Sequence, residues 1–232
     1  MARIIRIDVD RPFGRSPLIR HCLSRLSSDL CFPRTERLGF LAELQVTLQC
    51  LNESSARAYV FFRRCTLPSR PILDMLQIGG HEIGLHLENS RSFDTFADET
   101  RMLELHIGKK VVAITKHGSG GAKFGFHHYA PYEPEKYVEW ARKASMRLFL
   151  GNLQDPTLEP VKANGHLLVF PSAFWLEPHW RDTARFPVDW LLEHARHQDI
   201  VLLIHPENIL ADPGLVGDFR KLIGTLESRI FE

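Results

Sequence analysis

At 232 residues the chain has the size of one large domain, since repeated α/β folds such as barrels commonly run to roughly 250 residues without dividing. Hydrophobic residues make up 44% of the chain and charged residues 25%, and the formal net charge is +1. This is the balance of an ordinary globular protein, and it excludes a polybasic nucleic-acid-binding or membrane-binding chain. The sequence therefore predicts a single domain, residues 1–232, with a sizeable core.

Neither the N-terminal segment nor the cysteines show a targeting or cross-linking pattern. The N-terminus enters the segment Arg3–Asp8 directly, without the apolar core of a signal peptide, and no run approaches about 18 apolar residues. We therefore expect a cytoplasmic protein without a membrane span. No two cysteines have C-x-x-C spacing, so we expect free thiols: Cys22, Cys31, Cys50 and Cys65.

Short apolar runs alternate along the chain with segments of helical period, which is the pattern of parallel β/α repeats. The expected strands are Arg3–Asp8, Ala58–Phe62, Glu82–His86, Val111–Lys116, Arg147–Leu150, His166–Phe170 and Ile200–His205. The expected helices are Pro17–Ser27, Arg37–Leu51, Pro71–Gln77, Phe93–Ile107, Glu133–Ala144, Pro187–Arg196 and Pro213–Ser228. The stretches 118–125 and 154–164 have the composition of loops.

The positions of polar residues favour a closed barrel over an open sheet. Asp8, His86, His117 and His205 each lie at or directly after the end of an expected strand. In a (β/α) barrel all such ends converge on one face, whereas an open sheet would spread them out. We therefore predict an α/β fold, a distorted (β/α) barrel of about seven parallel strands.

Two carboxylates, Asp8 and Asp10, close the first strand just before Pro12. Alternation along a strand places both on one side, where they repel each other unless a cation or a proton lies between them. The pair therefore indicates one metal-bound carboxylate and one base, although an isolated D-x-D is as often a solvated turn.

The histidines near the expected site occupy positions that suggest different roles. His86 ends the third strand, where a neutral imidazole can bind a metal, while His81 begins that strand and fits a hydrogen-bonded structural role better. His205 ends the last strand, opposite the acids, where a general acid for a leaving amine is needed. His127 and His128 fit a loop surface.

Three segments resemble, in order, the motifs of the polysaccharide deacetylase (NodB-homology) family: Asp8–Asp10, Gly80–His86 and Leu202–Pro206. The fold of that family is a distorted (β/α) barrel. The resemblance implies that Asp8 is the catalytic base, that Asp10 and His86 bind a divalent metal, and that His205 is the general acid. The metal expected is zinc, with Co, Mn or Ni as alternatives.

Two positions depart from the family pattern. Its second metal histidine, four residues after the first, falls on Ser90, so His117, Glu88 or water must complete the ligand set. We favour His117 because it follows a strand end. The family's arginine-containing third motif, which orients the base, is replaced by 115–118, Thr-Lys-His-Gly.

The resemblance is strongest to the branch associated with O-antigen and other bacterial surface polysaccharides. It implies removal of an N-acyl group from an amino sugar carried on a nucleotide or a lipid. Asn152 and Trp175, which follow the fifth and sixth expected strands, are placed to hydrogen-bond to and stack on that sugar. Two alternatives stay open. The first is hydrolysis of another C–N bond, in a cyclic imide or amide. The second is an inactive barrel that binds a sugar, suggested by the residue Ser90.

Overall fold

The fold is seen in a computed structural model that describes residues 3–14, 18–32, 34–156 and 161–231. Within this part, nine strands form one sheet in the order β6-β7-β5-β4-β3-β2-β1-β9-β8. Their bounds are β1 Arg3–Val9, β2 Tyr59–Phe62, β3 Glu82–Leu87, β4 Ala113–Lys116, β5 Leu148–Leu153, β6 Lys162–Asn164, β7 Leu167–Ser172, β8 Phe174–Trp175 and β9 Ile200–Ile204. Every pairing is parallel except that of β6 with β7.

The sheet curls because one bent segment of the chain joins two strands that lie near opposite edges of the sheet. Strands β7 and β8 are separated only by Ala173, yet β7 pairs with β5 whereas β8 pairs with β9. The curled, mostly parallel sheet is therefore a distorted barrel, and the fold class predicted from the sequence is confirmed. All seven expected strands are present, with their ends at the expected residues or shifted by up to three residues.

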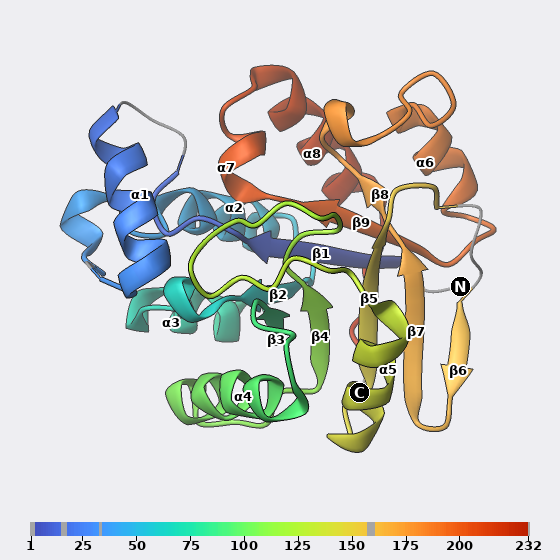
Figure 1. Ribbon diagram of the computed structural model, residues 1–232. Coiled ribbons are helices and arrows are strands. Elements are labelled where there is room, and N and C mark those ends of the chain that lie inside the picture. The colour runs from blue at the N-terminus through green and yellow to red at the C-terminus, as the bar shows by residue number, and fades with distance from the viewer. Residues whose placement is uncertain (1–2, 15–17, 33, 157–160, 232) are drawn as a thin grey trace.

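Helices surround the curled sheet (Figure 1). In the view of Figure 1, α1 to α3 lie at the left, α4 and α5 below the sheet, and α6 to α8 above it. Their bounds are α1 Leu18–Leu30, α2 Ala42–Glu53, α3 Arg70–Ile78, α4 Phe93–Ile107, α5 Pro134–Lys143, α6 Val188–His194, α7 Pro206–Ile209 and α8 Pro213–Thr225. Short 3-10 turns occur at η1 Glu36–Leu38, η2 Arg64–Thr66 and η3 Pro178–Trp180.

Alternation along each strand divides the core into two parts. In β1, Ile5 and Ile7 face outward and join the large apolar cluster beneath the helices. Ile4 faces inward with Phe61 and Leu203, in a smaller cluster that fills the interior of the barrel. Because Arg6 and Asp8 share the face of Ile4, the interior changes from apolar to charged toward the carboxyl ends of the strands.

Two expected elements differ from the structure. The helix expected over Arg37–Leu51 is broken, because Gly39 takes a left-handed φ of 84° that ends η1 before α2 begins. The loop expected over 154–164 ends in β6, which forms a hairpin with β7 at the amino-terminal end of that strand, away from the site. The first residue of the helix expected from Pro17 lies outside the described residues.

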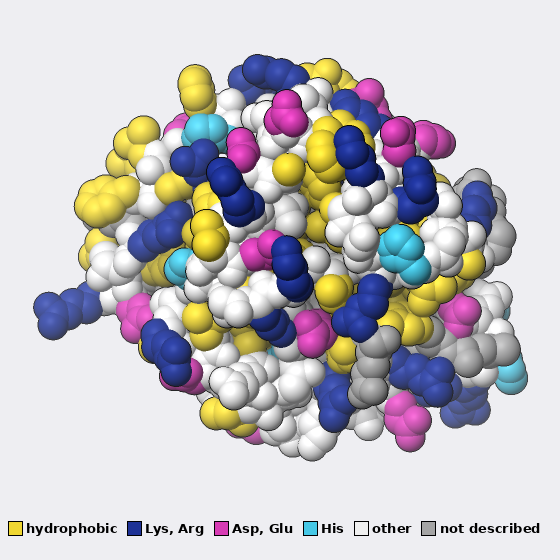
Figure 2. Space-filling view, turned by 90° about the horizontal axis from the view of Figure 1, so that it is seen from below, with side chains coloured by type: hydrophobic (Ala, Val, Ile, Leu, Met, Phe, Trp, Pro, Cys, Tyr) yellow, Lys and Arg dark blue, Asp and Glu magenta, His cyan; other side chains and the backbone are white. Residues whose placement is uncertain are grey.

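The surface gives two further observations. Lys and Arg side chains are intermixed with Asp and Glu over the face shown in Figure 2. Among the described residues, no helix has the length and apolarity needed to cross a bilayer.

Candidate metal centre

Strand register brings the polar residues to one level at the carboxyl end of the barrel. Val9 pairs with Phe62, and Phe62 pairs with Leu85, so the next residues of β1 and β3, Asp10 and His86, lie near each other. His86 itself pairs with Thr115 of β4, and His117 lies two residues further along on the same face. Residues far apart in sequence therefore meet at one point.

Asp10, His86 and His117 form a group whose donor atoms could hold one metal ion. Asp10 Oδ1 lies 2.9 Å from His86 Nε2 and 3.0 Å from His117 Nδ1, and the two imidazole nitrogens are 3.2 Å apart. Ligand atoms of a tetrahedral zinc site, with bonds of roughly 2.0–2.2 Å, stand about 3.3 Å apart. The triangle is slightly tighter than that, and two imidazoles with one carboxylate are a donor set that suits a divalent transition metal.

The charges around the site also fit a cation beside Asp10. Three neighbouring buried carboxylates each have a cationic partner: the pairs are Asp8 with Arg6, Glu88 with Arg63, and Glu177 with His205. Asp10 Oδ1 instead contacts two imidazoles, those of His86 and His117, while the imidazole of His205 lies 3.7 Å from Oδ2. The His117 imidazole is neutral, because burial and the charge of Arg63 lower the pKa of His117 to about 3. A neutral imidazole is the form that binds a metal.

The two other ligands considered for this site are engaged elsewhere. Glu88 is ion-paired with the buried guanidinium of Arg63. Ser90 is fully buried, and its hydroxyl lies 3.2 Å from the hydroxyl of Tyr137. The segment from Glu88 to Ser90 is a loop, and α4 begins only at Phe93, so Ser90 does not share a helical face with His86.

Arg6 orients Asp8 from within the same strand. Its Nε donates to Asp8 Oδ1 at 2.9 Å, and its Nη2 donates to Asp8 Oδ2 at 2.5 Å. Burial disfavours the charged form of Asp8, but the adjacent guanidinium, followed by His86, holds the pKa of Asp8 below its usual value. Arg6 thus supplies the guanidinium that the sequence motif after β4 lacks.

Asn152 lies beneath the site as part of the Arg6 network. Its Oδ1 accepts from Arg6 Nη2 at 2.8 Å, and its Nδ2 donates to the carbonyl of Lys116 at 2.7 Å. The remaining donors of Arg6 reach the carbonyls of Leu150 and Gly151. Asn152 is 4% exposed, so contact with a sugar stays a prediction that this geometry does not favour.

His205 faces Asp10 from the opposite wall. Its Nδ1 lies 2.7 Å from Glu177 Oε1, and its Nε2 lies 3.7 Å from Asp10 Oδ2. Burial alone would lower the pKa of His205, but the charge and hydrogen bond of Glu177 raise it to about 10. His205 is therefore protonated at neutral pH, with its second nitrogen directed at the site.

An aromatic side chain borders His205. The rings of Trp175 and His205 have centroids 5.7 Å apart. Trp175 is 8% exposed, and its indole Nε1 is buried without a hydrogen-bond partner among the described residues. The structure thus places Trp175 beside the proposed acid, and its contact with a sugar stays a prediction.

The loop after β4 covers His117. Phe124 packs against the His117 ring with centroids 5.6 Å apart. His128 was expected on a loop surface, but this is wrong: it is 3% exposed, because its Nε2 contacts Lys116 Nζ at 3.0 Å. His81, in contrast, is confirmed as structural, since it contacts Asn52 Oδ1 and the backbone N–H of Ala58.

Sequence reasoning missed three charged residues of the site: Arg6, Arg63 and Glu177. Arg6 carried a usable signal, because it shares a strand face with Asp8. Arg63 follows the second strand directly, so it too lies at the carboxyl end. There it donates to the carbonyl of Asp10 at 2.6 Å. Glu177 had no such signal beyond being an acid in an apolar segment.

The fold is an α/β barrel, and the carboxyl end of its strands carries an Asp-His-His cluster whose donor atoms could hold a divalent metal. No family model matches the chain, and no curated protein matches it significantly.

Solved structures share the fold. A crystal structure of PuuE allantoinase matches with a TM-score of 0.57 and 14% identity, covering 96% of this chain and 82% of that one. A probable polysaccharide deacetylase from Pseudomonas aeruginosa PAO1 matches with a TM-score of 0.55 and 12% identity, covering 96% and 83%. The CE4 family pseudoenzyme BA3943 from Bacillus anthracis matches at 0.49 and 14%, covering 95% of this chain. The chain spans 60% of the length of that pseudoenzyme. The two matches with TM-scores above 0.5 show that the chain shares the polysaccharide-deacetylase-like fold.

Proposed function

We propose that the chain is a metal-dependent hydrolase that removes an N-acyl group from an amino sugar. The observation that carries this proposal is the triangle of donor atoms from Asp10, His86 and His117, flanked by Asp8 on one side and His205 on the other. Asp10, His86 and His117 would then be the metal ligands, Asp8 the base and His205 the acid, all within one buried cluster.

Asp10, His86 and His117 would hold the ion, which when bound polarises the acyl carbonyl and lowers the pKa of a water molecule. Asp8, ionised by its pairing with Arg6, takes a proton from the attacking water as the new C–O bond forms. His205 gives its proton to the amine nitrogen as the C–N bond breaks, and Glu177 keeps the imidazole charged and oriented until that step. A carboxylic acid and a free amine leave.

The substrate and its setting belong to the same proposal. An acylated amino sugar carried on a nucleotide or lipid, used for O-antigen or another surface polysaccharide in the cytoplasm, is supported by the sequence resemblance. The name of one structural neighbour, a probable polysaccharide deacetylase, agrees with a sugar substrate.

A second candidate is hydrolysis of a C–N bond in a cyclic amide. The observation that favours it is the similarity to an allantoinase. The same base, acid and metal ligands serve either substrate, because both present a carbonyl carbon bonded to nitrogen.

The test combines metal analysis with two substrate panels. Purified protein is loaded with Zn, Co, Mn or Ni, and release of acetate from N-acetylated sugars is compared with ring opening of cyclic amides. Turnover of the sugars that a chelator abolishes and the metal restores supports the proposal. Turnover of cyclic amides alone supports the second candidate, and a protein that binds sugar without turnover is the inactive barrel.

A further inference from the structure

We propose that the outer face of α1 and the tip of the loop after β4 dock together on the surface of a lipid bilayer that contains anionic lipids. Seven exposed side chains form this surface, which we call the α1 patch: Arg25, Leu26, Leu30, Phe32, Arg34, Lys123 and Phe126. The inference goes beyond the proposed function, and only its last step, a lipid carrier for the amino sugar, rests on that function.

Helix α1 exposes leucines and buries serines. Leu26 and Leu30 lie one turn apart and are 51% and 69% exposed, whereas Ser24 and Ser27 of the same helix are 7% and 0% exposed. A helix at the surface of a globular protein normally turns its apolar side chains toward the core and its polar side chains toward solvent. The outer face of α1 therefore has the character of a face that contacts an apolar partner.

Two exposed phenylalanines extend this face. Phe32 follows α1 and is 72% exposed, and Phe126, in the loop after β4, is 76% exposed. The backbone N–H of Phe126 donates to Asp29 Oδ1 at 2.8 Å, and His127 Nε2 lies 3.1 Å from the carbonyl oxygen of Asp29. The loop is thereby held against the end of α1, so the exposed apolar side chains of the two segments lie near one another. A continuous exposed apolar surface of this kind marks an interaction site.

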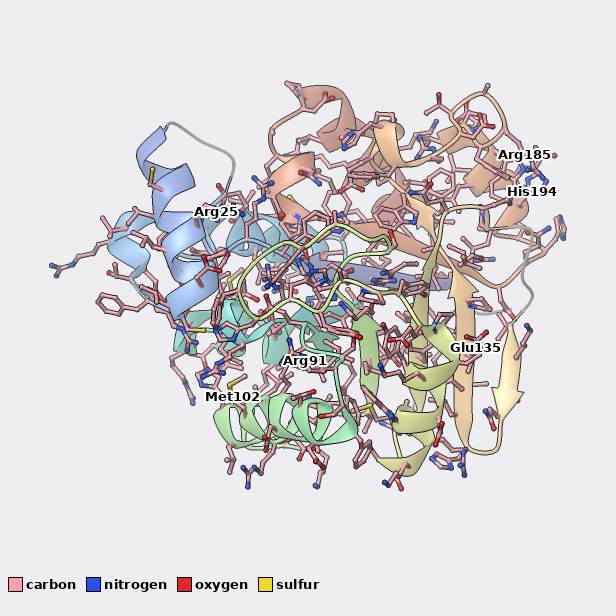
Figure 3. The ribbon with its side chains drawn as sticks, in the orientation of Figure 1. Arg25, Arg91, Met102, Glu135, Arg185 and His194 are labelled. Carbon is pink, nitrogen blue, oxygen red and sulfur yellow. The ribbon has the colours of Figure 1, made fainter. Side chains whose placement is uncertain are left out.

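The charged side chains of the patch are cationic. Arg25, which Figure 3 labels beside α1, is exposed, as are Arg34 and Lys123, and within the described residues none of the three has a carboxylate partner. The acids of the same segments, 22–36 and 123–127, are Asp29, which accepts the hydrogen bond from the loop, and Glu36. Unpaired cations beside exposed apolar side chains complement the phosphates and acyl chains of an anionic bilayer.

Lys123 and Phe126 show this combination within one loop. Lys123 Nζ lies 6.0 Å from the centroid of the Phe126 ring, so a cation borders an apolar side chain that would enter the bilayer. In Figure 2, hydrophobic side chains occur together with Lys and Arg at the left, which is the end of the molecule that carries α1 in Figure 1. Lysine is depleted in protein–protein interfaces, so the patch suits a bilayer better than a protein. It differs from a polybasic segment, which the composition excludes, because it offers apolar contact as well as charge.

The patch lies next to the candidate metal centre. Phe124 packs against the ring of His117 with centroids 5.6 Å apart, and Phe126 follows in the same loop. Docking through Phe126 therefore brings this side of the barrel to the level of the lipid headgroups. An amino sugar carried on a lipid reaches such a site without leaving the bilayer, whereas a sugar nucleotide requires no docking. Among the substrates of the proposed function, the patch therefore favours the lipid-carried one.

Co-sedimentation of the purified full chain with vesicles tests the docking. Vesicles of phosphatidylcholine alone are compared with vesicles of phosphatidylcholine and phosphatidylglycerol, each at low and high salt. One double variant, Leu30→Asn with Phe126→Ser, removes apolar side chains of the patch. A second, Arg25→Gln with Lys123→Gln, removes only exposed cations, so it keeps the test valid if the first variant does not fold.

The control variant changes the same kinds of residue at the opposite end of the barrel. Ile78 is 80% exposed and ends α3 before β3, and the Lys110 side chain is 87% exposed and precedes β4. Ile78→Asn with Lys110→Gln therefore removes one exposed apolar side chain and one exposed cation near the amino ends of the strands. Sedimentation velocity without vesicles shows whether the chain self-associates.

We expect the wild type to bind anionic vesicles at least about tenfold more tightly than neutral ones, and to lose this preference at high salt. Each patch variant should bind anionic vesicles about tenfold or more weakly than the wild type, because it lacks two of the side chains that contact the bilayer. The control should match the wild type. Release of acetate from water-soluble N-acetylglucosamine by metal-loaded protein should be the same in the wild type and both patch variants.

The absence of binding to anionic vesicles, or equal binding by the wild type and both patch variants, overturns the docking surface whether or not the protein hydrolyses sugars. Self-association that the Leu30→Asn, Phe126→Ser variant abolishes, without vesicle binding, also overturns it and assigns the patch to a second copy of the chain. Vesicle binding through the patch by a protein that hydrolyses no acylated amino sugar, free or lipid-linked, keeps the docking surface and rejects the hydrolase.

Discussion

Two buried histidines approach the same carboxylate, Asp10, from opposite walls of the barrel, and their protonation differs. His117 follows β4 and lies 3.0 Å from Asp10 Oδ1, whereas His205 follows β9 and lies 3.7 Å from Oδ2. Burial disfavours the charged form of both. Nevertheless the pKa of His117 falls to about 3, while that of His205 rises to about 10.

A second charged residue near each histidine explains why their pKa values differ. His117 lies near the cationic Arg63, which adds to the effect of burial. His205 has the carboxylate of Glu177 on its Nδ1, and this charge outweighs burial. One wall therefore presents a neutral nitrogen, suited to a metal, and the other an imidazolium, suited to donate a proton. pKa values shifted in opposite directions are typical of sites in which neighbouring titratable groups have different roles.

The largest expected effects come from deleting each histidine in turn. His117→Ala should lower metal affinity at least about a hundredfold, since loss of a ligand exceeds the 10- to 100-fold cost of changing its outer partners. His205→Ala should keep the metal and lose turnover by about a hundredfold or more. Chelator competition, elemental analysis and acetate release distinguish the two.

His81→Ala is the matched control, because His81 is also buried but lies at the other end of β3. It should retain wild-type metal content. If His117→Ala keeps its metal while His205→Ala loses it, the roles of metal ligand and acid assigned to these two histidines are reversed.

The two aspartates provide the next comparison. Asp8→Asn should lose turnover at least about a hundredfold with metal still bound, because the amide cannot accept a proton. Asp10→Asn should weaken metal binding by removing the charged ligand. Metal content and turnover are measured together on both variants. Loss of metal from Asp8→Asn with retention in Asp10→Asn would exchange their roles.

Glu177→Gln tests, through the pH dependence of stability, whether Glu177 raises the pKa of His205. In metal-free wild type, the raised pKa of His205 contributes stability that is complete below about 6.5 and is lost as pH rises toward about 10. The lowered pKa of Glu177 contributes stability that is lost as pH falls below its usual 4.5. Removing the carboxylate should remove the contribution of Glu177 and reduce that of His205, whose pKa Asp10 and Asp8 also raise. Urea unfolding between these limits should therefore show a flatter profile for Glu177→Gln than for wild type.

Glu133→Gln, which alters an exposed carboxylate paired with Lys136, should keep the wild-type profile. In metal-loaded enzyme, the alkaline limb of kcat should move to lower pH in Glu177→Gln, because the acid form is then lost earlier. An unchanged stability profile and an unchanged limb would mean that Glu177 does not charge His205.

The strand ends were predictable because periodicity and polarity are local properties of the sequence. The expected third strand contains His86, and the expected first strand ends at Asp8, so their convergence follows from parallel strands alone. The position of Arg6, which orients Asp8, was also predictable, since alternation along the strand places both residues on the same face.

The pairing of Glu177 with His205 could not be predicted from the sequence. Glu177 reaches His205 only because β8, a strand of two residues, pairs with β9 across the closing edge of the barrel. A strand so short has no periodicity to detect. The burial of His128 is similar, since it depends on Lys116, a lysine whose buried position the sequence pattern does not indicate.

The smallest expected effect concerns Ser90, where the family pattern would place a second metal histidine. A histidine there could bind the metal only if a helix followed His86 directly, with both imidazoles on one face. The segment is instead a loop, whose backbone N–H groups at Glu88 and Asn89 donate to the carboxylate of Glu99. Ser90 is fully buried beside Tyr137, so a larger side chain overpacks that contact at a cost of about 1–3 kcal/mol. We therefore expect Ser90→His to lower the urea midpoint and leave metal affinity unchanged, with Ser90→Ala as the control that removes the hydroxyl without adding bulk. Tighter metal binding by Ser90→His would show that the loop rearranges to the family conformation and that His117 is not needed as the third ligand.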